Sequence, residues 1–341
     1  KFSLTDLPNS TELSASNLRA ARLNADGTVI EGLSSPEVSL TDTPAETRIY
    51  ADTLRVAKID AGSAVLGSLN IAGVRLTIRE GRIEGTSKDI DAGNVTLAKT
   101  DSLPSGGELR DVKISKPVFI LEPAGRYRAS ADMSLGGGII GSVPLGAATA
   151  QVVVNNNGAE LSDLNAQVMD GSVTGNATIA FNDRTRSVIN ADFSGLDLGK
   201  LAALQSGRVI PLEGIASGRV DLSLAGTDYR TASGVVNATI TAAAGTDATN
   251  KIPINGAVDL SAVNGLFNVD QARLTAPNSE LTATGRFDLR NDDSNLNVEL
   301  RSTNAGEVLN IARVTGLTST LEPQIESMQL AAAGNLLLDG N

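Results

Sequence analysis

The sequence predicts an all-β fold, in which a long, predominantly antiparallel, curled sheet forms a β-groove, with a few short helices at the ends of repeats. Three observations predict it. Apolar and polar residues alternate at a period of two along most of the chain, turn residues separate the alternating runs, and landmarks recur about 108 residues apart. Successive side chains of a strand point to opposite faces, so each alternating run has one apolar and one polar face.

The alternation is clearest in "GSVTGNATIAFND", residues 171–183, where Val173, Ala177 and Ile179 fall on one side and Thr174 and Asn176 on the other. Similar runs occur from residue 74 to residue 300. The apolar face of the predicted groove is therefore expected to consist of Val74, Leu76, Ile78, Val95, Leu97, Val173, Ala177, Ile179, Phe181, Val220, Leu222, Leu224, Val236, Ile240, Val258, Leu260, Phe287, Leu289, Leu296, Val298 and Leu300.

Turn residues between these runs favour antiparallel neighbours. "NNNG" at 155–158, "NG" at 255–256 and 264–265, and "NDD" at 291–293 are typical of tight turns. Parallel strands need crossover connections of a dozen or more residues, and few gaps here are that long. A meander of strands is the simplest prediction.

Two stretches have the apolar spacing of short helices, residues 196–205 and 304–314. An Asp or Asn near the start of each would cap the helix by accepting a hydrogen bond from a free backbone N–H. Residues 196–205 are also compatible with a loop turn.

An internal repeat emerges when landmarks are aligned. "VPL" at 143–145 matches "IPI" at 252–254, and "VTGNATI" at 173–179 matches "ATGRFDL" at 283–289. We therefore expect a less regular N-terminal β segment at 1–142, a β-groove repeat at 143–251, and a second, incomplete repeat at 252–341 that continues the first.

The composition excludes several classes of function. The chain has no His and no Cys, so it lacks the usual general base, imidazole or thiolate metal ligands and thiol nucleophiles. Its net charge of −11 disfavours a nucleic-acid partner, because such binding depends on Lys and Arg. Three Tyr and no Trp leave few platforms for a polysaccharide-cleaving enzyme. The acidic turn at Asp292 and Asp293 does not match a calcium loop. We expect no enzyme activity, no cofactor and no metal.

The first residue is Lys1, and no apolar run of 18 residues occurs. We interpret the sequence as a piece of a longer polypeptide whose anchor lies outside it.

Two architectures would cover the apolar faces. Tandem immunoglobulin-like sandwiches, as in a surface or adhesin protein, also repeat near 100 residues, but their cores usually contain large aromatic residues and here aromatics are 3%. A single curled sheet of strands rich in Gly and Ala would instead hide its apolar face inside a trough, with bends expected at Gly175 and Gly285. An open aliphatic trough favours an acyl-chain ligand, because exposed apolar surface costs about 25 cal/mol per Å².

Residues 112–135, "VKISKPVFILEPAGRYRASADMSL", carry Ile114, Pro117, Leu121 and Gly125 in the spacing I-x-x-P-x-x-x-L-x-x-x-G. This phrase resembles one that recurs in the AsmA-like and TamB family of envelope proteins. Residues 159–201 resemble the strands of that family, and in this sequence the last of these strands reads "ADFSGLDL". The resemblance covers about residues 60–341.

The resemblance implies a β-taco, a long groove in the periplasm of a Gram-negative-type bacterium, anchored in the inner membrane by a segment outside this sequence. It implies phospholipid transport between the inner and outer membranes, with acyl chains in the groove and no chemical step. An outer-membrane protein partner is also implied, so a scaffold for outer-membrane protein assembly is an alternative function. Arg126, Tyr127 and Arg128 would either contact lipid headgroups or occupy the wet face of a strand.

Overall fold

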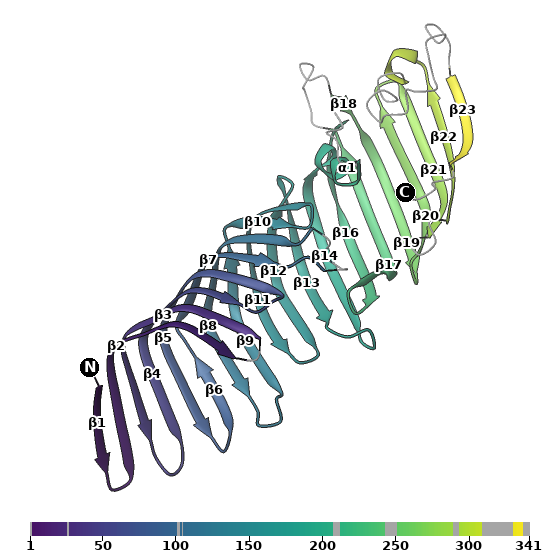
Figure 1. The fold of residues 1–341 in the computed structure, drawn as a ribbon. Coiled ribbons are helices and arrows are strands. Elements are labelled where there is room, and N and C mark those ends of the chain that lie inside the picture. The colour runs from purple at the N-terminus through teal and green to yellow at the C-terminus, as the bar shows by residue number, and fades with distance from the viewer. Residues whose placement is uncertain are drawn as a thin grey trace. The chain divides into compact units, whose positions relative to one another are not determined.

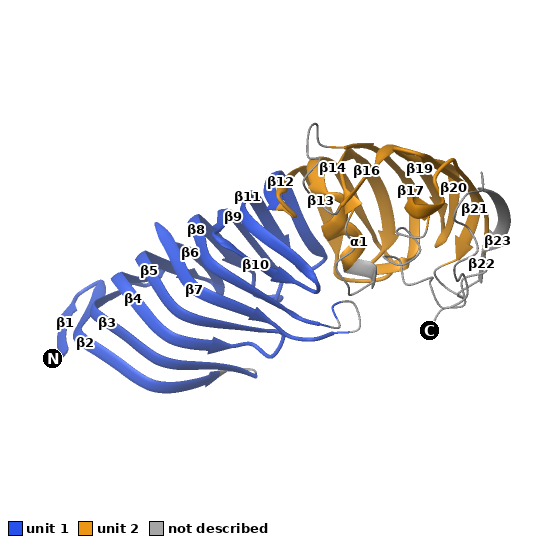
Figure 2. Cartoon of the chain, turned by 90° about the horizontal axis from the view of Figure 1, so that it is seen from above, with its two compact units in different colours: residues 1–167 blue, residues 168–341 orange. Residues whose placement is uncertain are grey.

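The computed structural model describes residues 2–25, 27–100, 103, 105–206, 212–242, 251–288, 293–308 and 330–336. The chain forms two compact units, residues 1–167 and 168–341 (Figure 2), which are described separately. The predicted all-β fold is confirmed in both. Among the described residues, strands pair antiparallel except for one short parallel pair in the second unit.

Unit 1 is built on one curled antiparallel sheet (Figure 1). Its strands are β1 (Phe2–Leu7), β2 (Ser10–Ala25), β3 (Thr28–Asp42), β4 (Thr47–Asp60), β5 (Ala64–Arg79), β6 (Arg82–Thr86), β7 (Asp89–Leu97), β8 (Gly107–Leu121), β9 (Tyr127–Leu135), β10 (Gly137–Ile140), β11 (Val143–Asn155) and most of β12 (Gly158–Val168). Strands β6 and β7 both pair with β5 and with β8, so together they act as one long strand with a break at residues 87–88. Strands β9 and β10 pair in the same divided way with β8 and β11.

Two lines of left-handed residues cross the sheet of unit 1. Line A consists of Asn17, Gly73 and Lys116, and line B consists of Gly32, Ser68 and Asp111, all with φ between 51° and 66°. The left-handed conformation interrupts an extended strand and bends it. The long strands therefore curve along their length, which is visible in the blue unit of Figure 2.

Each left-handed residue also shifts the alternation of side chains by one position. On β5, Leu66 and Leu69 flank Ser68, and both belong to the same hydrophobic cluster. The spacing of three recurs on neighbouring strands along line B. The pairs are Ile30 and Leu33, Val56 and Ile59, Leu66 and Leu69, Ala92 and Val95, and Leu109 and Val112. Apolar side chains thus stay on one face while the strand turns.

Unit 2 contains antiparallel strands of a large sheet, a short helix and a two-stranded pair (Figure 1). Its elements are β13 (Gly171–Ala180), β14 (Arg186–Asp197), α1 (Leu198–Ser206), β15 (Leu212–Glu213), β16 (Ile215–Ala225), β17 (Asp228–Thr241), β18 (Ile252–Pro253), β19 (Asn255–Val263), β20 (Leu266–Ala276), β21 (Ser279–Asp288), β22 (Asp293–Ser302) and β23 (Leu330–Leu336). The sheet runs β13–β14–β16–β17–β19–β20–β21–β22–β23, and β15 pairs in parallel with β18.

The helix predicted at 196–205 is confirmed as α1, although residues 196 and 197 still belong to β14. Asp197 caps the helix, because the backbone N–H of Lys200 donates to its Oδ1 over 2.8 Å. Of the second predicted helix, 304–314, residues 305–308 are helical and 309–314 lie outside the described residues. Its cap is Asn304, whose Oδ1 accepts from the N–H of Gly306 at 2.9 Å.

Both helices contact the hairpin turn that precedes them in the sheet. Lys200 Nζ lies 2.6 Å from Asp170 Oδ2, and the backbone N–H of Asn278 donates to Glu307 Oε2 over 2.9 Å. Residues 170 and 278, like residues 200 and 307, are one repeat apart in the sequence. The repeated strand-and-helix arrangement supports the sequence repeat. The compact units divide at 167/168, whereas the predicted segment boundaries at 142/143 and 251/252 stay predictions.

Gly175 and Gly285 are required by the close approach of a neighbouring strand. Their φ angles are 157° and 130°, and a Cβ atom would lie 2.2 Å from the carbonyl oxygen of Asn190 and 2.3 Å from that of Asn295, respectively. Both residues have partners in the ladder, Gly175 with Ala191 and Gly285 with Leu296, although the pairing of β20 with β21 shifts register next to Gly285. They differ from the residues of lines A and B, which have no partner in the ladders that cross them.

Ser187 joins three strands of unit 2 through its hydroxyl group. The side chain is 1% exposed; its Oγ accepts from the backbone N–H of Ala180 over 2.9 Å and donates to the carbonyl of Gly226. A buried hydroxyl with both roles satisfied holds the ends of β13, β14 and β16 together.

We predict that Gly175→Ala lowers the free energy of unfolding by about 1–3 kcal/mol, because the new Cβ would strike a backbone carbonyl that has no room to move. Urea unfolding of the purified chain measures this. Gly93→Ala is the matched control, since its Cβ would lie 3.5 Å from the nearest side chain. Equal stability of the two variants would contradict the requirement.

We predict that Ser187→Ala lowers the free energy of unfolding by about 1–3 kcal/mol, because it leaves a buried N–H and a buried carbonyl without partners. Ser194→Ala makes the same chemical change at an exposed position on β14 and is expected to shift stability by less than about 0.5 kcal/mol. Thermal unfolding of both variants provides the comparison, and a larger loss for Ser194→Ala would refute it.

Candidate functional site

The candidate site is the apolar face of each sheet, here called the groove face. In an antiparallel ladder, directly paired residues point to the same side, so the register shows which side chains share this face. Three rows of unit 1 cross successive strands. They are Leu13, Leu40, Ile49 and Leu76; Ile30, Ile59, Leu66, Val95 and Leu109; and Leu54, Ile71, Ile90, Ile114 and Met133.

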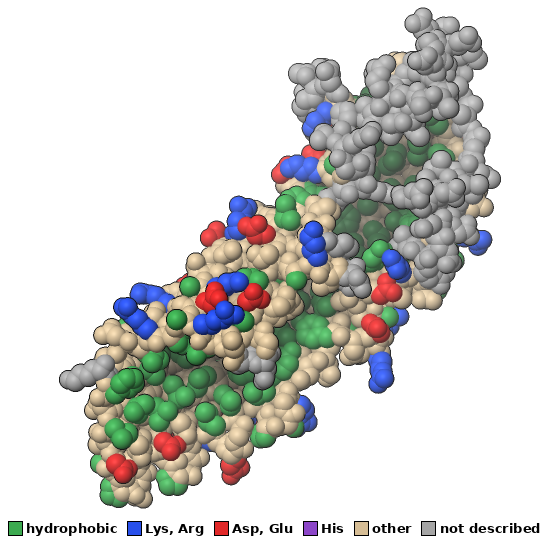
Figure 3. Space-filling view, in the orientation of Figure 1, with side chains coloured by type: hydrophobic (Ala, Val, Ile, Leu, Met, Phe, Trp, Pro, Cys, Tyr) green, Lys and Arg blue, Asp and Glu red, His purple; other side chains and the backbone are tan. Residues whose placement is uncertain are grey.

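The rows of unit 1 line a hollow surface. Figure 3 shows hydrophobic side chains gathered on the concave side of this unit. Most of them are half-buried rather than buried, and the buried row Val56, Leu69, Ala92 and Val112 forms the base beside line B. The surface is aliphatic and carries no hydrogen-bond donors along these rows, so it suits an alkyl chain.

Four rows form the groove face of unit 2. They are Val173, Phe193, Gly218, Ala238, Val258, Ala272, Ala283 and Val298; Gly175, Ala191, Val220, Val236, Leu260, Val269, Gly285 and Leu296; Ala177, Ile189, Leu222, Gly234, Ala262, Phe267 and Phe287; and Ala216, Ile240, Gly256, Leu274, Leu281 and Leu300. Phe267 and Phe287 stack with ring centroids 5.1 Å apart. Every row contains glycine or alanine among its larger side chains, and these small residues leave low points on the surface.

Most of the groove-face residues that the sequence predicted lie on strands of these sheets. Val74, Leu76, Ile78, Val95 and Leu97 lie on strands of unit 1, and Val74 pairs with Ala51, Ile78 with Ile83, and Leu97 with Ala64 and Gly107. The predicted residues of unit 2 that fall in the rows are Val173, Ala177, Val220, Leu222, Val236, Ile240, Val258, Leu260, Phe287, Leu296, Val298 and Leu300. Ile179 lies in β13 two residues beyond Ala177, and Leu224 pairs with Ser187 at the end of β16.

Two predicted residues do not fall on a described strand. Phe181 follows the last residue of β13 and is 53% exposed, because the chain leaves the strand for a turn one residue earlier. Leu289 lies outside the described residues.

Among the residues that the sequence prediction missed, one group lies beside line B. Ile30, Leu33, Val56, Leu69 and Val112 interrupt a strict two-residue alternation, so they do not stand out as members of one face. Their signal is an apolar pair at a spacing of three that flanks Gly, Ser, Asn or Asp, repeated on several strands.

The opposite face of the sheet in unit 2 is polar. Asn237 Nδ2 donates to Asp259 Oδ1 over 2.6 Å, and Arg273 Nε lies 2.8 Å from Glu280 Oε1. On β16, the hydrogen bond to Asp221 raises the pKa of Arg219. Charged pairs of this kind keep the outer surface hydrated, so the two faces differ sharply in polarity.

Charges of unit 1 also gather at hairpin ends. Glu46, in the turn between β3 and β4, accepts a hydrogen bond from Arg79 and pairs with Arg48. The hydrogen bond from Arg79 is the main cause that lowers the pKa of the Glu46 carboxyl group. At the β8–β9 hairpin, Arg126 and Arg128 are exposed, whereas Tyr127 is half-buried and pairs with Leu121.

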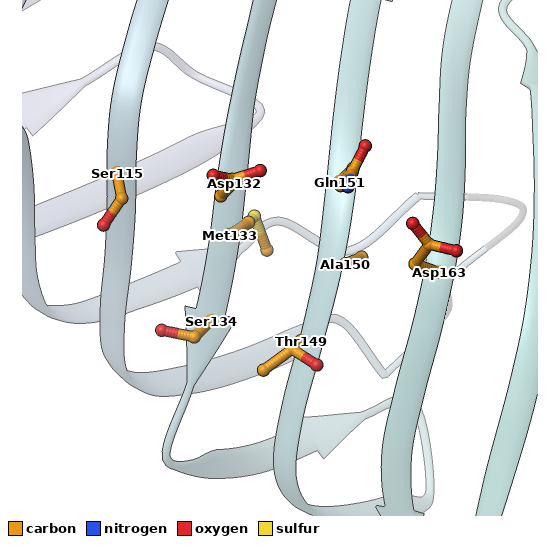
Figure 4. Close-up of a pocket in the computed structure, with 8 residues that line it drawn as sticks. All are labelled: Ser115, Asp132, Met133, Ser134, Thr149, Ala150, Gln151 and Asp163. Carbon is orange, nitrogen blue, oxygen red and sulfur yellow. The ribbon is translucent and has the colours of Figure 1, made fainter.

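Figure 4 shows a separate polar pocket of about 280 Å³ in unit 1. Ser115, Asp132 and Gln151 stand in register across β8, β9 and β11, with Asp163 of β12 beside them. Lys116 Nζ lies 4.0 Å from Asp132 Oδ2. The described residues contain no group of three or more acidic side chains placed to hold a metal ion. The pocket lies beside line A, where the pairing of β8 with β9 shifts register after Ser115.

None of the helices among the described residues has both the length and the apolar character needed to cross a bilayer. Comparisons with protein-family models, with curated proteins and with solved structures find no match for this chain. The resemblance to AsmA-like and TamB envelope proteins therefore stays a prediction.

We predict that a fluorophore attached at Ile71→Cys emits at shorter wavelength and is attached more slowly than one at Asn70→Cys. Residue 71 lies in a groove-face row and residue 70 is exposed on the other side of β5. The chain has no native cysteine, so each variant carries a single label. Identical emission and labelling rates at the two positions would contradict the assignment of faces.

Proposed function

We propose that this chain is a segment of a hydrophobic groove that conducts phospholipids without a chemical step. The observation that carries the proposal is the row pattern of the groove face. In unit 2, aliphatic side chains continue from strand to strand in register, while the opposite face of the same strands carries polar pairs such as Asn237 and Asp259. Such a surface offers acyl chains a continuous apolar path and leaves their headgroups in water.

The energetics favour an occupied groove over an empty one. Apolar surface in contact with water costs about 25 cal/mol per Å², and a large one-sided apolar face of a soluble protein marks a site of interaction. Successive strands lie about 4.8 Å apart, so an acyl chain that moves along a row meets an equivalent set of methyl groups every few ångströms. A repeated weak site favours sliding over tight binding.

A tandem β-sandwich is not supported. Among the described residues, the strands of unit 1 belong to one sheet, and the only sheet of unit 2 apart from the large one is the pair β15–β18, with two residues in each strand. A sandwich needs a second sheet of similar size to bury the first.

The cellular setting of the proposal comes from the resemblance. On that basis the groove lies in the periplasm of a Gram-negative-type bacterium, is anchored in the inner membrane by a segment outside this sequence, and delivers phospholipid to an outer-membrane partner.

We predict that the purified chain carries phospholipid, detected by native mass spectrometry and by lipid extraction. Ile179→Asp places a carboxylate on the groove face and is expected to reduce bound lipid and vesicle-to-vesicle lipid transfer at least fivefold, because a charge in the path must be desolvated by a passing acyl chain.

Thr178→Asp is the matched control, since it adds the same charge to the exposed face of the same strand. It should leave both quantities within twofold of the unaltered chain. Lipid-free protein, or equal transfer by the two variants, would overturn the proposed groove.

A further inference from the structure

The two edges of the groove in unit 2 are built differently. At one edge, α1 and the β15–β18 pair lie over the margin of the groove face. Leu198 and Leu201 of α1 pack against the buried cluster that contains Leu196, Ala216 and Ile240. The groove is therefore covered at this edge by apolar side chains.

The other edge consists of hairpin turns, because β13, β16 and β19 all end there and β14, β17 and β20 begin there. Two neighbouring turns, residues 181–186 and 226–230, are here called the hairpin rim. The backbone N–H of Gly226 donates to the carbonyl of Thr185 over 3.0 Å, which joins the two turns. The rim is thus a connected structure rather than two separate loops.

Hydrogen bonds within each turn fix its shape. Asn182 Oδ1 accepts from the backbone N–H groups of Arg184 and Thr185 at 3.0 and 3.1 Å. In the second turn, Asp228 Oδ1 accepts from the backbone N–H of Arg230 at 3.0 Å. Asn182 and Asp228 thus bond to the backbone of their turns. The side chains of Arg184 and Arg230 are exposed at the surface.

The rim presents aromatic and cationic groups together. Phe181 and Tyr229 are 53% and 54% exposed, and the guanidinium carbon of Arg230 lies 5.8 Å from the centre of the Tyr229 ring. Arg184 is exposed, and Arg186 donates to the carbonyl and hydroxyl of Ser223. The rim has three arginines and two acids, Asp183 and Asp228. Its charge is therefore positive, whereas the whole chain has a net charge of −11.

We infer that the hairpin rim contacts the phosphate groups of phospholipids whose acyl chains occupy the groove of unit 2. The inference rests on the proposed function and adds to it the edge on which the headgroups lie. Guanidinium groups bind phosphate oxygens through charge-assisted hydrogen bonds. Exposed aromatic rings suit the boundary between an apolar groove and water. The described residues of α1, β15 and β18 include no arginine and no aromatic side chain.

Fluorescence quenching tests the position of the headgroups. A fluorophore is attached at Tyr229→Cys on the hairpin rim, at Lys200→Cys on α1, and at Ile179→Cys on the groove face, in three separate variants. Each is loaded with phosphatidylcholine that carries a nitroxide either on the headgroup or on an acyl chain. We expect the headgroup nitroxide to quench position 229 at least twofold more than position 200, and the acyl nitroxide to quench position 179.

Equal or stronger headgroup quenching at position 200 would overturn the inference and leave the proposed groove intact, provided that position 179 is quenched by the acyl nitroxide. No quenching at position 179 would overturn the groove and the inference with it.

A second measurement tests the arginines. The triple variant Arg184→Gln, Arg186→Gln and Arg230→Gln is loaded from vesicles of equal phosphatidylglycerol and phosphatidylethanolamine. We expect its bound ratio of the anionic to the zwitterionic lipid to fall at least threefold, with total bound lipid within twofold. The control Arg219→Gln, Arg273→Gln and Arg301→Gln removes the same charge from the polar face. An unchanged ratio, or an equal fall in the control, would overturn the inference.

Discussion

The structure of unit 1 depends on one local constraint, which is the need to keep apolar side chains on a single face of strands that bend. A strand of 15 or 16 residues would extend about 50 Å if straight. Here β5 and β8 carry a left-handed residue at both lines, β2 carries one at line A and β3 one at line B, and each of these residues shifts the alternation by one. The apolar pairs at a spacing of three, such as Leu66 and Leu69, compensate for this shift. Without them, one half of each strand would present its polar side to the groove.

Unit 2 meets the same need by a different route. Its strands have 10 to 14 residues where they build the main sheet, apart from the shorter β19 and β23, and Gly175 and Gly285 keep their partners Ala191 and Leu296 in the ladder. Glycine there permits a neighbouring carbonyl to approach closely, and it leaves low points between larger side chains on the groove face. The margin is then covered by α1 and by the β15–β18 pair. Both units thus expose an aliphatic surface, but only unit 2 covers one edge of it with a helix among the described residues.

Period-two alternation was sufficient to predict the fold class, the polar and apolar faces, and a part of the residues of unit 2 between Val173 and Leu300 that share a row. The cap of α1 was also predictable from the sequence, because Asp197 stands directly before the helix. Lines A and B were not predictable from alternation, since a left-handed Lys116 or Ser68 is selected by the packing of the surrounding sheet and not by its own propensity. The pairing of Leu212 with Ile252 joins residues 40 positions apart, so no local pattern reveals it. Phe181 was misplaced because the alternation continues one step beyond the point where the chain turns.

On the proposed function, affinity and selectivity belong to different surfaces. The groove rows consist of methyl and methylene groups, which attract any acyl chain and distinguish poorly among lipids. The groups that we infer to bind the lipid phosphate lie at the hairpin rim, where exposed arginines stand beside aromatic rings. Charge attraction at such an exposed edge is weak and screened by salt. A lipid is therefore held mainly by burial of its chains and oriented by its headgroup, which permits passage along the rows without release of a tightly bound anion at each step.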